Sequence, residues 1–236
     1  MSVLSAKQSV GLFGYDDNKG IMAIQVKFGP KESKPSRPGA YSVGNAKADL
    51  SDSPKLMTGP LIASVNSLEA FETALLAPTR CLFILTGNPL TLPNLLQRAN
   101  DHGKLCMVNI DFLDGLSRDR FAVEFLAANG VAGIVSTRSE ALKFAQGLGL
   151  MTVLRTFAID TAAVMAAKKS LAQFRPNAIE VLPAMVAPRV GKCLRETYSD
   201  LTTIGGGLIE NLKEIEELLA AGIHAVTTSN SRLWLI

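Results

Sequence analysis

Residues 131–157, VAGIVSTRSEALKFAQGLGLMTVLRTF, hold one complete βα unit and the strand that follows it. A short apolar run is followed by a helix-length amphipathic stretch and then by a second apolar run, which is the alternation typical of strand, helix and strand. Ser139 with Glu140 is a signal for the start of a helix. Strands joined through a helix in this way pair in parallel, so this segment predicts a parallel α/β fold.

The same alternation runs from residue 61 to the end of the chain. Apolar runs of strand length begin near eight positions: Leu61, Cys81, Leu105, Val131, Met151, Ala178, Thr202 and His224. Their spacing averages about 23 residues, which is regular enough to indicate eight repeated βα units closed into a barrel. Asn66 or Ser67 begins the first helix, and Gly130 and Gly222 follow the third and the seventh. We predict a parallel (β/α)8 TIM-like barrel.

The last βα unit is too short for a complete helix. After the eighth strand only residues 231–236 remain, so the predicted barrel has a truncated last helix. The outer face between the first and last strands is then left partly bare. We expect the apolar tail that contains Trp234 and a strand-like run at 21–28 to cover it, in the same chain or in a neighbouring subunit.

The first quarter of the chain differs from the rest. Residues 1–59 form an irregular extension with one expected strand at 21–28, and the residues after it are rich in Pro, Gly, Ser and Lys, as linkers are. We place the domain boundary near Gly59, with the barrel at 60–236. The extension also holds the whole net charge of +3, because residues 61–236 have 16 basic and 16 acidic residues.

Composition narrows the class of protein. Of the 236 residues 47% are hydrophobic and 19% are charged, which is typical of a chain with a buried core. No apolar stretch approaches the ~20 residues that span a bilayer, and the first residues lack a secretory signal pattern. We therefore expect a cytoplasmic protein. The three cysteines are not spaced as a zinc site or a disulfide framework, so we expect no metal.

Ligands of such barrels bind at the carboxyl ends of the strands, which sorts the polar residues by position. Both histidines, His102 and His224, fall at the opposite ends of their strands, so histidine catalysis is not expected. Charged residues stand late in strands three to six: Asp111, Arg138, Arg155 and Glu180. Charges in apolar strands are costly unless paired, so we expect these four to meet one another or a polar ligand. A buried ion-pair network without a ligand is the alternative.

A second group of residues at the strand ends has the chemistry of an anion site. Gly205, Gly206 and Gly207 follow the seventh strand, and Thr227, Thr228, Ser229 and Asn230 follow the eighth. Barrels bind phosphate with these two loops, because glycines let backbone N–H groups approach an anion and short hydroxyls add donors. We predict that a phosphate group is bound by Gly206, Gly207, Thr228 and Ser229.

Two basic clusters lie around the fifth and sixth predicted helices. One contains Lys168, Lys169 and Arg175, and the other has Arg189, Lys192 and Arg195 at intervals of three residues. A solvated helix face is one interpretation. The alternative is a single stripe across neighbouring helices that follows a phosphate backbone.

The segment from about Leu61 to Trp234 resembles the glycerol-3-phosphate responsive antiterminator family. Six motifs carry the resemblance in the family's order: NIDFLDGL from Asn109, GIVSTR from Gly133, RTF from Arg155, IEVLP from Ile179, GGLI from Gly206, and TTSN from Thr227 with Trp234. Three positions depart from the family's usual residues, since Asn109 and Ile110 replace histidine and valine and Gly205 replaces alanine. The extension at 1–59 has no counterpart that we recognise in the family.

The resemblance implies a βα barrel with a short last helix and a glycerol-3-phosphate site at the strand ends. It also implies binding to leader mRNA that prevents premature transcription termination, with no cofactor besides the effector. On this interpretation the protein is a regulator and not an enzyme. Two alternatives remain: a phosphosugar enzyme that uses Asp111 and Glu180 as acid and base, and a non-catalytic scaffold whose extension recruits a partner. A homo-oligomer is compatible with each of them.

Overall fold

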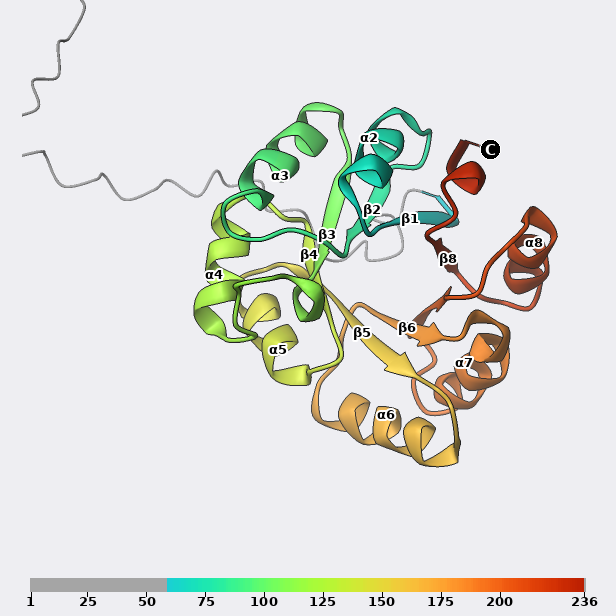
Figure 1. Cartoon of the computed structure of the whole chain (residues 1–236). Helices are drawn as coiled ribbons and strands as arrows, with labels where there is room; N and C mark the ends of the chain where they lie inside the picture. Colours follow the sequence, from blue (N-terminus) through green and yellow to red (C-terminus); the bar gives the residue numbers. More distant parts are fainter. Residues whose placement is uncertain (1–58, 236) are drawn as a thin grey trace, which may run out of the picture. The chain divides into compact units, whose positions relative to one another are not determined.

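The structure is a computed structural model that describes residues 59–235, and their backbone forms a closed parallel barrel (Figure 1). The strands are β1 (Leu61–Val65), β2 (Cys81–Ile84), β3 (Leu105–Asn109), β4 (Gly133–Ser136), β5 (Met151–Phe157), β6 (Ala178–Leu182), β7 (Thr202–Gly206) and β8 (Ala225–Thr228). Each strand pairs in parallel with the next, and β8 closes onto β1. The predicted fold is confirmed, whereas the expected strand at 21–28 lies outside the described residues.

Seven helices connect the described strands and surround the barrel in chain order (Figure 1). They are α2 (Leu68–Leu76), α3 (Leu92–Asp101), α4 (Arg120–Ala128), α5 (Ser139–Gly147), α6 (Thr161–Gln173), α7 (Ala187–Arg195) and α8 (Leu212–Ala220). Ser67 caps α2 through its side chain, and α5 begins at Ser139, as predicted. Gly130 and Gly222 follow α4 and α8 with φ of 77° and 85°, a left-handed conformation that favours glycine.

Two apolar clusters hold the barrel together. The larger one packs the outward faces of the strands against the helices. The smaller one fills the barrel interior, and its buried members include Ile62, Phe83, Met107, Val153 and Ile204. Side chains alternate between the two clusters along each strand because the strand period is two residues. A cavity of only about 10 Å³ remains within the interior cluster, large enough for at most one water molecule.

A short 3-10 helix, η4 (Ser231–Leu235), stands where a complete eighth helix would be. Trp234 is fully buried, and η4 packs against α2 and β1. The indole Nε1 donates a hydrogen bond of 2.9 Å to the carbonyl of Thr228. The expected role of the tail in covering the gap between the first and last strands is therefore confirmed for Trp234.

None of the helices between residues 59 and 235 is long and apolar enough to cross a membrane.

The amino ends of the strands are stabilised by polar contacts. Lys104, which precedes β3, is buried and donates from Nζ to the carbonyls of Ala77 and Thr79. Burial lowers the pKa of this lysine, and nearby Arg80 adds to the effect. His224 precedes β8 and accepts a 3.0 Å hydrogen bond from the Thr203 N–H through Nδ1. The opposite end of the barrel carries the candidate site.

Candidate functional site

A cavity of about 500 Å³ opens at the carboxyl ends of the strands. Its walls come mainly from the ends of β1, β5, β6 and β8 and from the loops after β7 and β8. The residues that line it are Ser64, Asn66, Leu85, Arg155, Leu182, Gly207, Leu208, Ile209, Glu210, Thr227, Thr228, Ser229 and Asn230. Three of the four predicted phosphate-binding residues, Gly207, Thr228 and Ser229, lie in this lining. The volume is within the ordinary range of small-molecule sites.

The loops after β7 and β8 are bonded to each other at the rim of the cavity. Asn230 donates from Nδ2 to the Glu210 carbonyl at 3.2 Å, and the Thr228 hydroxyl lies 3.4 Å from the Ile209 carbonyl. Gly207 and Leu208 have φ of 80° and 61°, so the chain turns sharply after β7. This turn and the Ser229 hydroxyl are the groups available to an anion, whereas the Thr228 hydroxyl would have to exchange its long contact with the Ile209 carbonyl for one.

The amino end of α8 is already satisfied by protein groups. Asn211 caps it by accepting from the Glu214 N–H, and the Glu214 carboxylate accepts from the Glu210 N–H at 2.7 Å. A phosphate group at that helix end would face carboxylates. The anion chemistry of this edge therefore rests on the Gly207 turn, Thr228 and Ser229, rather than on the helix end.

A buried polar cluster lies beneath the cavity. Glu180 is fully buried, and its Oε1 accepts a 2.7 Å hydrogen bond from the Thr227 hydroxyl. Its Oε2 lies 2.9 Å from Nε of Arg155, so the two side chains form a buried ion pair. Burial raises the pKa of Glu180, while Arg155 and Thr227 oppose the shift. The expected pairing of Arg155 with Glu180 is confirmed.

Gly206 is adjacent to this buried cluster and does not line the cavity. A Cβ atom at position 206 would lie 2.3 Å from the Thr227 hydroxyl oxygen and 2.7 Å from Oε1 of Glu180. Both distances are far below van der Waals contact. Position 206 therefore requires glycine because the carboxylate and the hydroxyl occupy the space of a side chain.

The structure does not bring Asp111 and Arg138 into contact with the other two charges, and their expected contact with a ligand stays a prediction. Strand β3 ends at Asn109, and Asp111 lies in the short helix η2 (Ile110–Phe112) and is not among the residues that line the cavity. Its carboxylate accepts from the Ser136 hydroxyl at 3.1 Å and from the Thr137 N–H and hydroxyl at 2.6 and 2.9 Å.

The charge on Asp111 is balanced by Arg118, whose Nε lies 3.2 Å from Oδ1. Arg138 is exposed and takes part in none of the ion pairs among residues 59–235. The sequence interpretation weighed only charges late in strands, so it missed Arg118, which stands in the loop before α4.

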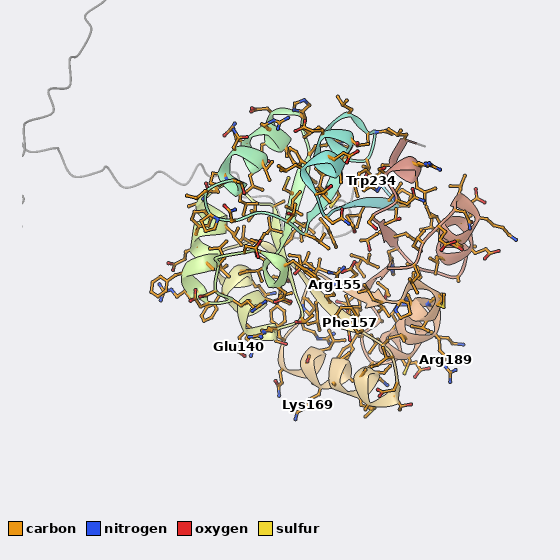
Figure 2. All side chains as sticks on the ribbon, in the orientation of Figure 1. Glu140, Arg155, Phe157, Lys169, Arg189 and Trp234 are labelled. Carbon is orange, nitrogen blue, oxygen red and sulfur yellow. The ribbon has the colours of Figure 1, made fainter. Side chains whose placement is uncertain are left out.

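Two half-exposed phenylalanines border Arg155 at the mouth of the barrel. The Arg155 guanidinium lies 5.5 Å from the centre of the Phe112 ring, and Phe157 follows Arg155 by two residues on the same face of β5. Figure 2 places Arg155 near the centre of the barrel with Phe157 beside it.

The sequence interpretation also missed Ser64 and Asn66, which line the cavity. Polar residues at the carboxyl end of the first strand were a signal that could have identified them.

The candidate RNA-binding cations divide into exposed and engaged residues. Lys169, Arg189 and Lys192 are exposed, and Figure 2 shows Lys169 and Arg189 on the outer sides of α6 and α7. Arg195 is half-buried and donates from Nη1 to the Thr203 hydroxyl at 3.0 Å. Lys168 is half-buried, and its carbonyl accepts from the Tyr198 hydroxyl at 3.3 Å. The exposed stripe is thus three residues and not five.

No group of three or more His, Cys, Asp or Glu side chains between residues 59 and 235 is arranged to hold a metal ion.

Comparison with known proteins matches residues 61–234 to the family described as glycerol-3-phosphate responsive antiterminator. The chain belongs to this family. The antiterminator match spans all eight strands and both loops that line the cavity.

Three relatives extend this result. A glycerol uptake operon antiterminator-related protein from Thermotoga maritima MSB8 is 29% identical, with a TM-score of 0.67 over 75% of this chain and 98% of its own. A glycerol uptake operon antiterminator regulatory protein from Listeria monocytogenes str. 4b F2365 is 29% identical, with a TM-score of 0.69 over 74% and 94%. The protein YgcP of Escherichia coli (strain K12) is 28% identical over 77% of this antiterminator-family chain and 94% of its own.

Proposed function

We propose that this chain is a glycerol-3-phosphate-responsive regulator that binds leader mRNA of glycerol-utilisation genes and prevents transcription termination. Membership of the antiterminator family supports the regulatory part of the proposal. The observation that carries the effector part is the cavity at the ends of β7 and β8, where a glycine turn and two hydroxyls stand over a buried arginine. That combination fits a small phosphorylated ligand.

In the proposed complex the phosphate group binds at Gly207, Thr228 and Ser229, which line one wall of the cavity. Gly206 supports this wall indirectly, because only a glycine there leaves room for the Thr227 and Glu180 side chains. The three-carbon part of the ligand extends toward Arg155. Asp111 and Arg138 have no place in this arrangement and instead belong to the loops after β3 and β4.

The transcript would bind outside the barrel, on the stripe formed by Lys169, Arg189 and Lys192. The barrel segment has equal numbers of acidic and basic residues, so an RNA contact must be local. Tyr198 links α6 to the end of α7 through the Lys168 carbonyl, and the Arg175 guanidinium stacks over the Tyr198 ring at 3.9 Å. These contacts give the two helices a fixed spacing, which a surface that follows an RNA backbone needs.

The enzyme alternative receives less support. It uses Asp111 and Glu180 as an acid and base pair, and such a pair must reach the same ligand. Glu180 is buried beneath the cavity by its contacts with Thr227 and Arg155, and Asp111 is bonded to the β4 loop outside it. The scaffold alternative, in which the extension recruits a partner, makes no use of the cavity.

The test is a gel mobility-shift titration of the full chain with the leader RNA of a glycerol uptake gene, with and without glycerol-3-phosphate. We expect binding that strengthens with the effector and weakens with salt, with a slope of log K against log salt of about −0.7 per phosphate contact. Arg189→Glu with Lys192→Glu should abolish most of this binding. Lys213→Glu is the control for charge reversal at an exposed helix residue. Lys213 lies on α8, which carries none of the candidate RNA-binding residues, and it pairs with Glu217.

Three results would redirect the proposal. If the double variant binds as well as the wild type, the stripe is a solvated face. If a chain that lacks residues 1–58 loses binding while the double variant retains it, the RNA contact lies in the extension. If the wild type binds no leader RNA at any effector concentration, and instead turns over triose or glycerol phosphates, the enzyme alternative replaces the regulator.

A further inference from the structure

The layer of inward-facing residues nearest the mouth of the barrel is polar. Four members of the interior apolar cluster come from alternate strands: Ile62, Met107, Val153 and Ile204. Two residues further along each of the same strands, on the same inward face, stand Ser64, Asn109, Arg155 and Gly206. Such layers are ordinarily filled by large branched side chains. This layer has three polar side chains and one position without any.

Asn109 contributes an unpartnered donor to this layer. The side chain is 1% exposed, and its Oδ1 accepts a 3.0 Å hydrogen bond from the Asp111 N–H. That bond fixes the orientation of the amide, because only the oxygen can accept from the Asp111 N–H. The other end, Nδ2, has no hydrogen-bond partner among the described residues. Buried amide donors rarely stay unpaired, so a further group is expected at Nδ2.

The cavity reaches the same layer. Ser64 and Arg155, two of its polar members, line the cavity. Leu85 also lines the cavity. Ile84 of β2 pairs with Val108 of β3, so the next residues along the two strands, Leu85 and Asn109, are neighbours. Asn109 is not itself among the lining residues, but it neighbours the lining residue Leu85 in the sheet and shares its layer with Ser64 and Arg155.

We infer that Ser64 and Asn109 form a hydroxyl-binding subsite in which Nδ2 of Asn109 donates to a hydroxyl oxygen of a phosphorylated polyol. This inference rests on the proposed function, which puts the phosphate group at the β7 and β8 loops. A hydroxyl fits the subsite better than a carboxylate, because the charge of Arg155 is already balanced by Glu180 and the donors that remain are neutral.

The subsite makes Asn109 a specificity-determining residue. A ligand with a phosphate group but without the hydroxyl leaves Nδ2 buried and unpaired, and sites built in this way discriminate strongly against such analogues. Neutral histidine offers one ring acceptor and one ring donor. Exchange of asparagine for histidine should therefore keep the subsite, whereas leucine of similar size should remove it.

The test compares ligands by isothermal titration calorimetry on the full chain. We expect the wild type to bind glycerol-3-phosphate at least tenfold more tightly than n-propyl phosphate, which lacks both hydroxyls. Asn109→Leu should bind the two ligands equally, with its affinity for n-propyl phosphate within twofold of the wild type. Asn109→His should keep the preference. Asn109→Asp preserves the acceptor for the Asp111 N–H but lacks the donor, so it should also lose the preference. It serves as the test if the leucine variant does not fold.

The outcomes separate this inference from the proposed function. If the folded leucine and aspartate variants keep the full preference, Nδ2 does not contact the ligand and the inference is wrong. If the wild type binds glycerol-3-phosphate and n-propyl phosphate equally, the subsite fails while the effector site stands. If the wild type binds neither compound, the proposed effector function fails.

Discussion

Gly206 offers the sharpest test of the buried cluster beneath the cavity. In Gly206→Ala the new methyl group would lie 2.3 Å from the Thr227 hydroxyl oxygen and 2.7 Å from Oε1 of Glu180. These two atoms are joined by a 2.7 Å hydrogen bond within the barrel, so neither can move without breaking it. Loss of a hydrogen bond to a charged group costs about 1.5–3 kcal/mol, and overpacking adds about 1–3 kcal/mol.

We therefore expect Gly206→Ala to lower the free energy of unfolding by about 3 kcal/mol or more. For a domain of this size that corresponds to a decrease in Tm of about 6–12 °C, measured by differential scanning calorimetry. Gly205→Ala is the matched control on the same strand. Its Cβ atom would lie 3.4 Å from the nearest atom, Cβ of Ala187, which is an ordinary contact. If the two variants melt within 2 °C of each other, the reasoning about position 206 is wrong.

Three further variants test the other contacts. Arg155→Leu leaves Glu180 buried without its cation, and we expect it to lower the free energy of unfolding by about 3–5 kcal/mol at pH 8. Burial raises the pKa of Glu180, so the folded state binds a proton on this carboxylate more readily than the unfolded state does. The loss measured by urea titration should therefore shrink as the pH falls toward 5. Asp111→Asn weakens the contacts between Asp111 and the β4 loop, so we expect a lower Tm. The affinity for glycerol-3-phosphate should stay within twofold of the wild type. A large loss of affinity would show that Asp111 contacts the ligand. Trp234→Phe removes the hydrogen bond to Thr228 and should cost about 1–2 kcal/mol in chemical unfolding; an unchanged midpoint would show that packing alone holds the tail.

The barrel was predictable because its signals are local and repeated. Apolar strand runs and helix signals such as Ser67 and Ser139 recur in each unit, and a parallel sheet of eight such units closes on itself. The shortened last unit was equally visible, since six residues cannot form a full helix. Strand starts at positions 133 and 225 fell within two residues of those predicted.

The site was predictable only where strand position determined the contact. Arg155 and Glu180 are adjacent in the register of β5 and β6, so their pairing follows from the strands alone. Asp111 lies beyond the end of β3, where the direction of a side chain depends on how the loop turns. Its partner Arg118 is supplied by that same loop, and strand periodicity carries no information about loop geometry.

The chain contains a single tryptophan, and its position gives the protein an intrinsic optical probe. Because the indole of Trp234 is bonded to the carbonyl of Thr228, its emission reports on the backbone of the β8 loop. A ligand that engages Thr228 or Ser229 would alter the polarity and rigidity around the indole without any label being introduced. Stopped-flow fluorescence could then time the arrival of the effector separately from that of the RNA, which shows whether the ligand binds before the transcript.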